Sequence, residues 1–182
     1  MKNLSRFKVG ILAIVAASLT ALISTTGVLS QAPARNQLKL ILEAQKQVIV
    51  KDENGKNKIN WQPLGETSVV QPGDILLYTV RGEEKQNKPV NNFVVTQAIS
   101  PQTIYILNSA EVAQKGNENM KIVYSIDGGK TFTENPTIQI TLPDGKIETK
   151  PAPAENYTHI RYVFNTPIVP DNFKASYQVK VK

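Results

Sequence analysis

Few residues in this chain could act in catalysis. It contains one histidine, His159, and no cysteine among 182 residues. A serine or threonine nucleophile needs a positioned base, and a tetrahedral zinc site needs several histidine or thiolate ligands. His159 would have to fill either role alone, on what alternation predicts to be the polar face of a strand. We therefore expect no catalytic residues, no bound cofactor and no enzymatic activity.

Three loops combine acids with glycine and could offer oxygen ligands to calcium. They are Asp52-Glu53-Asn54-Gly55, Asp127-Gly128-Gly129 and Pro143-Asp144-Gly145. Each has only one or two acids, and none has the spaced acid series that an EF-hand loop uses to bind calcium. Asparagine or aspartate followed by glycine is typical of tight turns between strands. We interpret all three loops as turns and predict no metal site.

Exposed aromatic rings could form a platform for sugars, because an aromatic ring offers a flat apolar face and, in Trp and Tyr, a polar group. Four tyrosines alternate in phase with apolar neighbours and are expected in the core instead: Tyr78, Tyr124, Tyr162 and Tyr177. Trp61 and Tyr157 lie outside this alternation. They are the two candidate ligand-binding residues.

The element that organises the chain begins at a turn, Pro72-Gly73-Asp74. Proline fixes φ, glycine tolerates positive φ, and aspartate can accept hydrogen bonds from nearby backbone amides. Residues 75–80 follow with apolar or aromatic side chains at most positions of both alternating faces. This pattern predicts a central strand that is covered on both sides.

Short runs rich in β-branched and aromatic residues recur with turn sequences about ten residues apart. They occupy 38–50, 58–61, 93–96, 103–107, 122–126, 131–133, 138–142, 159–164 and 175–181. The first run could also form an amphipathic helix, but Val48 to Val50 followed by Asn54-Gly55 favours a hairpin. Residues 108–119 are predicted to be a loop. The chain is expected to be all-β, an immunoglobulin-like antiparallel sandwich of about eight or nine strands, with a closed barrel as the alternative.

The N-terminus has the pattern of an export signal. Basic residues at positions 2, 6 and 8 precede an apolar run over 9–23, and no acid occurs before Glu43. We predict a signal peptide over 1–34; the alternative is an uncleaved N-terminal anchor. Residues 35–182 are then long enough for a single domain that buries about 68–70% of its unfolded surface without a disulfide. The predicted location is periplasmic, secreted or on the cell surface.

The net charge does not indicate a nucleic-acid partner. The chain carries 21 basic and 15 acidic residues, a formal charge of +6. Three of the basic residues lie in the predicted signal and none of the acids does, so the charge after cleavage is +3. The remaining basic and acidic residues are interspersed along the chain without a basic stripe. We expect no nucleic acid to bind, because such binders concentrate Lys and Arg on one face.

Two stretches carry a family resemblance. The sequence Gln71-Pro72-Gly73-Asp74 followed by Tyr78-Thr79, and then Asn91-Asn92-Phe93-Val94-Val95-Thr96, resembles the bacterial conserved-repeat module called domain of unknown function eleven. The segments 127–132 and 177–181 are similar to its later strands, so the resemblance covers 67–182. The chain departs from the family at Gln97 and Ser100, and at Asp171 after Pro170, where the family has an acid, a proline and a glycine.

The resemblance implies an exported sandwich. The family usually occurs as tandem modules in large bacterial surface proteins, whereas one copy follows the signal here, as in small exported proteins of cyanobacterial type. We therefore expect a non-catalytic cell-envelope or surface module that acts as a spacer or a protein-interaction domain. The alternative is a glycan-binding sandwich that uses Trp61 and Tyr157. The partner would be an envelope protein or glycan, and a membrane would be contacted only through an uncleaved N-terminus.

Overall fold

The computed structural model describes residues 20–21, 39–83, 89–113, 120–169 and 173–182. The strands are β1 (Thr20–Ala21), β2 (Lys39–Lys51), β3 (Asn57–Pro63), β4 (Ile75–Glu83), β5 (Val94–Ala98), β6 (Thr103–Tyr105), β7 (Glu111–Val112), β8 (Met120–Ser125), β9 (Thr137–Thr141), β10 (Ile147–Pro151), β11 (His159–Phe164) and β12 (Lys174–Val181). One 3₁₀ turn, η2, covers Ala154–Asn156. The predicted all-β class is confirmed, with more strands than the eight or nine expected.

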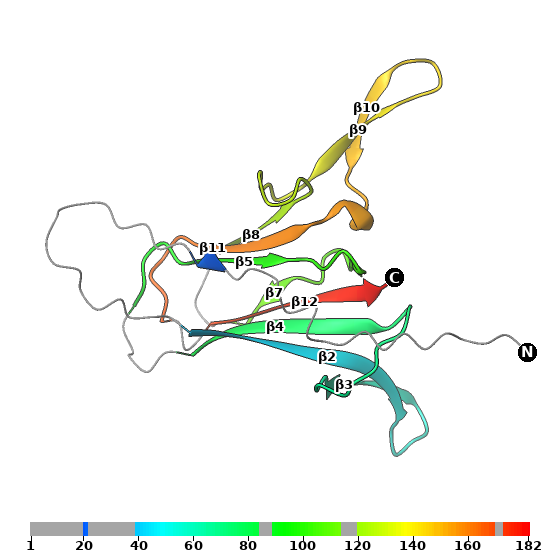
Figure 1. Ribbon diagram of the computed structural model, residues 1–182, viewed down its shortest axis with the longest axis vertical. Helices are drawn as coiled ribbons and strands as arrows, with labels where there is room; N and C mark the ends of the chain where they lie inside the picture. Colours follow the sequence, from blue (N-terminus) through cyan, green and yellow to red (C-terminus); the bar gives the residue numbers. More distant parts are fainter. Residues whose placement is uncertain (1–19, 22–38, 84–88, 114–119, 170–172) are drawn as a thin grey trace, which may run out of the picture.

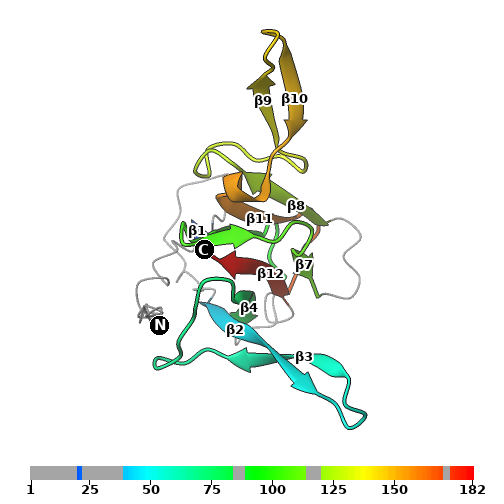
Figure 2. The same cartoon turned by 90° about the vertical axis from the view of Figure 1, so that its right-hand side faces the viewer.

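Two antiparallel sheets form an open sandwich (Figures 1 and 2). One has the strand order β1-β5-β11-β8 and the other β3-β2-β4-β12-β6, with β7 also paired to β12. The third sheet is the two-stranded β9–β10 hairpin, which stands away from the sandwich in both views. Within the described residues the sheets do not close on themselves, so the barrel alternative is wrong.

The strand predicted to be central is β4, which pairs with β2 on one side and β12 on the other. Its turn contains Gly73 with φ +94°, and the Asp74 carboxylate accepts a hydrogen bond from the Gln71 amide at 2.7 Å. One face of β4 carries the fully buried Leu76. The other carries Leu77, which is only half-buried. We expected both faces of β4 to be buried, but only the face that carries Leu76 is fully buried.

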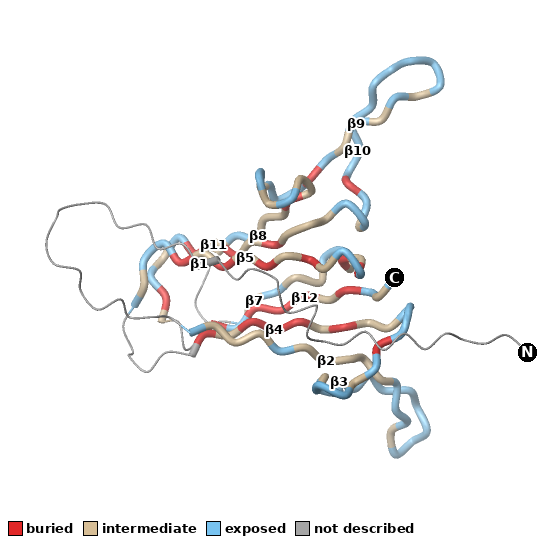
Figure 3. The backbone as a smooth tube through the Cα atoms, in the orientation of Figure 1, coloured by how far each residue is buried: buried red, intermediate tan, exposed pale blue. Residues whose placement is uncertain are grey.

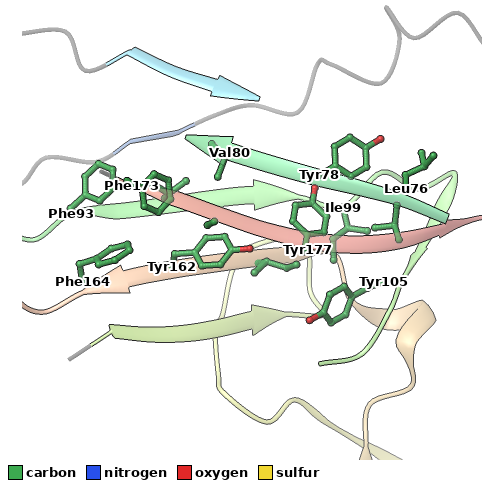
Figure 4. Packing of buried hydrophobic residues seen from close by; sticks show 14 of the residues in the cluster. Leu76, Tyr78, Val80, Phe93, Ile99, Tyr105, Tyr162, Phe164, Phe173 and Tyr177 are labelled. Atoms are coloured by element: carbon green, nitrogen blue, oxygen red, sulfur yellow. The ribbon is translucent and has the colours of Figure 1, made fainter. Parts of the chain in front are cut away.

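The core fills the space between the two larger sheets (Figures 3 and 4). Tyr78 of β4 stacks on Tyr177 of β12, with ring centroids 5.4 Å apart. At one end of the core, the Phe173 ring packs edge-on against Phe93 and Phe164. Burial falls off toward the hairpin tips, which are exposed. The core prediction is confirmed for Tyr78, Tyr162 and Tyr177, while Tyr124 is half-buried.

Several predicted elements differ from the structure, and β10, over Ile147–Pro151, was not among the predicted strands. The predicted loop 108–119 contains the short strand β7, which pairs with β12. The predicted strand 131–133 forms only an isolated bridge, in which Thr133 pairs with Tyr124. The preceding turn is held by many hydrogen bonds to Asp127, and these fix a compact loop where the sequence pattern suggested a regular ladder.

Two hairpins extend in opposite directions along the longest axis of the molecule (Figures 1 and 2). β2 pairs with β4 only as far as Lys46, and from Gln47 to Lys51 its partner is β3 alone. At the other end, β9 pairs with β10 over the whole of Thr137–Thr141. Both hairpins turn at the Asx-Gly sequences that the sequence predicted.

The predicted signal peptide lies outside the described residues except for β1, in which Thr20 and Ala21 pair with Thr96 and Val95 of β5. Export, cleavage and the anchor alternative therefore stay predictions. In the part of the chain that the structure describes, no helix has the length and apolar character needed to cross a membrane.

Candidate interaction surface

An exposed apolar patch lies on the β2–β3 hairpin. Ile49 of β2 is directly opposite Ile59 of β3, and the two side chains are 68% and 56% exposed. Trp61 lies two residues beyond Ile59 on the same face of β3 and is half-buried. We call Ile49, Ile59 and Trp61 the hairpin patch. Isolated exposed isoleucines are ordinary on a surface, but neighbouring ones together with the only tryptophan form a candidate contact.

The hairpin patch faces away from the core. Trp61 is opposite Gln47 of β2, and Gln45 on the same face is opposite Leu77 of β4. Leu77 alternates with Leu76, which is 1% exposed and points into the core. Opposed residues of an antiparallel pair share a face, so the patch is on the outer face of the six-stranded sheet.

The patch borders a free strand edge. Among the described strands, β3 is paired only with β2. The Leu64 amide donates to the Ala44 carbonyl and the Asp52 amide to the Lys56 carbonyl, so even-numbered residues of β3 bond toward β2. The amide and carbonyl groups of Ile59 and Trp61 consequently point outward, whereas Pro63, the last residue of β3, has no amide, so an added strand would pair only as far as Trp61. An added strand could bond to them and lay its side chains beside the patch.

The two sequence-predicted ligand residues are far apart. Trp61 is on β3, the first strand of the six-stranded sheet, whereas Tyr157 packs on Tyr105 of β6, at the opposite edge. With strands about 4.8 Å apart, these edges are separated by roughly 19 Å. They also lie on opposite faces, because Tyr105 is opposite the buried Val179. Trp61 and Tyr157 therefore do not form one platform.

Tyr157 belongs to an aromatic cluster at the end of the core. Its ring centroid is 5.3 Å from that of Tyr105 and 5.4 Å from that of Tyr124. The Tyr105 hydroxyl donates to the Tyr124 hydroxyl at 3.3 Å. Burial raises the pKa of Tyr157. The Tyr157 ring is therefore better placed to cover the end of the core than to contact a ligand.

The densest polar cluster surrounds Asp127. Its carboxylate accepts hydrogen bonds from the Thr131 hydroxyl at 2.6 Å, from the Ser125 hydroxyl at 2.7 Å and from the Lys130 amide at 3.0 Å. The Ser125 hydroxyl in turn accepts from the Gly129 amide at 2.9 Å. The bonds from Thr131, and then the one from Ser125, hold the pKa of Asp127 well below its usual range. These donors, on residues before and after Asp127, hold the loop in its compact shape.

His159 lies next to this cluster without joining it as a base. Its Nδ1 is 3.1 Å from the Thr158 hydroxyl, which itself donates to the Ser125 carbonyl. A hydroxyl has one proton to give, so Nδ1 is the donor in that contact. A Cβ at Gly129 would be 3.2 Å from the imidazole ring, so the loop covers one side of His159. Ser125 donates to Asp127, so no Ser–His pair is assembled.

Contacts between Arg161 and Phe132 hold the Asp127 loop against the outer face of β11. The guanidinium carbon lies 3.5 Å from the Phe132 ring centroid, and Nε donates to the Thr96 hydroxyl of β5 at 3.0 Å. The Phe132 and His159 rings also meet edge to face at 6.4 Å. This outer face is therefore partly covered by the chain itself, unlike the hairpin patch.

The acids of the three loops serve their own turns. Asp52 accepts from the Asn54 and Lys56 amides at 2.9 and 2.8 Å, and Asp144 accepts from the Lys146 amide at 3.1 Å. The turn interpretation is confirmed by these bonds. Among the described residues no group of three or more potential ligands gathers as a metal site would require.

The hairpin patch was missed by the sequence reasoning, which treated Val48 to Val50 only as strand residues. Counting outward from the Asn54-Gly55 turn would have placed Ile49 opposite Ile59 and both beside Trp61. Comparisons of the chain with protein-family models, with curated proteins and with solved structures found no match.

Proposed function

We propose that this protein is an exported, non-catalytic envelope module that binds a protein partner through the hairpin patch and the free edge of β3. The observation that carries the proposal is that the exposed Ile59 and the half-buried Trp61 have outward-pointing backbone groups on one strand, beside the exposed Ile49 of β2. A polypeptide in extended form can use both, since its backbone pairs with the edge and its side chains cover the patch.

Two features support a binding role over an enzymatic one. The polar cluster around Asp127 uses its donors and acceptors to close a loop, and the only histidine donates to a neighbouring threonine. The projecting hairpins also place their tips away from the sandwich, where a partner can reach them (Figure 3). The export signal and the resemblance to the conserved-repeat module supply the expected compartment, the cell envelope.

A glycan is the less favoured partner. Stacking on a sugar would use coplanar exposed rings, and Tyr157 is packed into the aromatic cluster on the far side of the sheet from Trp61. Trp61 would have to act without a second ring. Its neighbours Ile49 and Ile59 are aliphatic, which suits an apolar peptide side chain better than a hydroxylated surface.

The proposal is tested by sedimenting the purified protein with cell envelopes isolated from its host. We expect saturable retention that protease treatment of the envelopes abolishes and glycosidase treatment leaves intact. Ile49→Ser should weaken retention about tenfold or more, because it removes the most exposed apolar side chain of the patch. Ile147→Ser is the matched control, since Ile147 is also an isoleucine that is 68% exposed, but on the other hairpin.

Three results would contradict the proposal. Absence of retention would exclude an envelope-binding role. Retention that is lost only after glycosidase treatment would make glycan the partner. Equal losses in Ile49→Ser and Ile147→Ser would show nonspecific adhesion of exposed isoleucines instead of binding at the hairpin patch.

A further inference from the structure

The projecting β9–β10 hairpin has two free edges of different character. On one edge, β10 carries Glu148 and Lys150 and ends at Pro151, which are residue types that discourage strand addition. On the other edge, β9 has neither charge nor proline. In the described part of the chain, β9 pairs with no strand except β10. One edge is therefore protected and the other is open.

The hydrogen bonds at the two ends of the hairpin show which backbone groups of β9 are free to pair. The Leu142 amide donates to the Lys146 carbonyl at 2.8 Å, and the Ala152 amide donates to the Pro136 carbonyl at 2.9 Å. Bonded pairs alternate along an antiparallel ladder, so the even-numbered residues of β9 bond toward β10. Thr137, Gln139 and Thr141 direct their amide and carbonyl groups outward.

The sequence of β9 reads the same in both directions: Thr137-Ile138-Gln139-Ile140-Thr141. When a copy is turned by a two-fold axis at Gln139, every residue of the strand is therefore opposite a residue of its own type. Gln139 would be opposite the partner's Gln139, Thr137 opposite the partner's Thr141, and Ile138 opposite the partner's Ile140. We propose that the protein forms a two-fold homodimer by antiparallel pairing of β9 with the β9 of a second copy.

This register satisfies the backbone and the side chains together. Outward-pointing residues meet outward-pointing residues, whereas a shift by one residue would set them against inward-pointing ones. Ile138 and Ile140, which are half-buried in one copy, gain the partner's isoleucines as close neighbours on the same face. Threonine faces threonine on the other face, and both residue types favour strands.

The charges of the outer strands do not oppose this pairing, because Lys150 and Glu148 already form an ion pair within one copy, with Nζ 3.2 Å from Oε2. Ile138 is opposite Lys150 within one copy and Ile140 is opposite Glu148. In the dimer the four strands would be ordered β10, β9, then β9 and β10 of the second copy. A line across them would run from Lys150 through Ile138 to the second copy's Ile140 and Glu148. No like charges face each other at the junction. The second copy therefore matches this strand in apolar surface, and the charges of the outer strands neither attract nor repel it appreciably.

The contact is small, so the dimer is expected to be reversible and concentration-dependent and not obligate, since a single strand pair buries less area than a standard interface. The dimer uses β9, whereas the proposed envelope binding uses β3. Either proposal can therefore fail without the other. If the protein is exported to a surface that holds many copies together, their effective concentration rises and dimerisation is favoured.

Sedimentation velocity of the purified protein over increasing concentration tests the dimer. Gln139→Lys sets two lysines against each other at the two-fold axis and should weaken dimerisation about tenfold or more. Thr149→Lys is the matched control, because Thr149 is exposed and directly opposite Gln139 on the same face. Its lysine would be about 14 Å from the partner's, which is beyond the screening length of physiological salt.

Mixing Gln139→Lys with Gln139→Glu should restore dimers, since opposite charges then meet at the axis. Circular dichroism of each variant should show the unchanged strand signal. A wild-type protein that stays monomeric at every concentration would overturn the proposal. So would a Thr149→Lys variant that loses dimerisation as strongly as Gln139→Lys, or a charge-swapped mixture that remains monomeric.

Discussion

The guanidinium carbon of Arg161 lies 3.5 Å from the centroid of the Phe132 ring. Phe132 follows the Asp127 loop and precedes the β9–β10 hairpin, whereas Arg161 is on β11, inside the sandwich sheet. The contact therefore fastens the root of a projecting hairpin to the body of the molecule. Because Nε also donates to the Thr96 hydroxyl, one side chain joins the loop to both β11 and β5.

Replacing Arg161 by methionine should lower the free energy of unfolding by about 1–2 kcal/mol. The variant loses a partly exposed cation–π contact and one hydrogen bond, each worth about 0.5–1.5 kcal/mol. Urea denaturation measures the loss. Arg161→Lys keeps the cation but not the planar guanidinium group, so its free energy of unfolding should lie between those of the wild type and the methionine variant. A methionine variant as stable as the wild type would show that the loop is held by Asp127 alone.

Asp127 should make stability depend on pH in the acidic range. Its pKa is lowered in the fold, chiefly by the hydrogen bonds from Thr131. The stabilisation is present above the unfolded pKa of about 4 and is lost as the pH falls below it. Asp127→Asn should flatten the fall in the urea midpoint between about pH 5 and pH 2. Thr131→Val, which keeps the carboxylate, should raise the Asp127 pKa in an NMR titration; an unchanged value would contradict this account.

His159 should titrate below its ordinary pKa of 6.5. Burial lowers its pKa and the positive charge of Arg161 lowers it further, while Asp127 opposes them. The fold therefore favours the neutral ring, so its contribution to stability is present above about pH 6.5 and is lost as the pH falls below that value. NMR titration should show a higher pKa in Arg161→Gln and a lower one in Asp127→Asn. Shifts of the opposite sign would exclude these electrostatic contacts.

Tyr162 should resist ionisation until the protein unfolds in alkali. Its ring is fully buried, burial raises its pKa, and its hydroxyl donates to the Ser176 carbonyl at 3.1 Å. The neutral form favoured by the fold stabilises it below about pH 10, and this stabilisation is lost as the pH rises. Tyr162→Phe should cost about 1 kcal/mol in urea denaturation, because the hydrogen bond to the Ser176 carbonyl is lost. A neutral or stabilising effect would show that Ser176 finds another donor.

Trp61 and Tyr157 should respond differently to alanine. Tyr157→Ala should cost about 2 kcal/mol, because its ring packs against Tyr105 and Tyr124. Trp61→Ala should cost less, about 1 kcal/mol, since its half-buried ring lies on an outer sheet face and not against the core. Thermal and urea denaturation measure both. The reverse order would make Trp61 a structural residue and Tyr157 the better ligand candidate.

Much of the fold follows from local sequence. The Asx-Gly turns and the alternating runs placed the hairpins at Asn54-Gly55 and Asp144-Gly145, and the apolar character of 75–80 identified the central strand. These features are local because a turn needs particular φ values and a half-buried strand needs a period of two. The bridge at Thr133 and the strand β7 were not predictable, since each depends on contacts with distant residues.

The amino-acid sequence by itself determined the all-β class, the turns and three tyrosines of the core, Tyr78, Tyr162 and Tyr177, because each depends on residue type and spacing along one segment. Only the tertiary structure decided which surfaces stay open. It separated Trp61 from Tyr157 across the sheet, placed Ile49 beside Ile59, and left the edges of β3 and β9 without a neighbour among the described strands. Strand order decides such questions, and it is fixed by pairing between segments that are far apart in the chain.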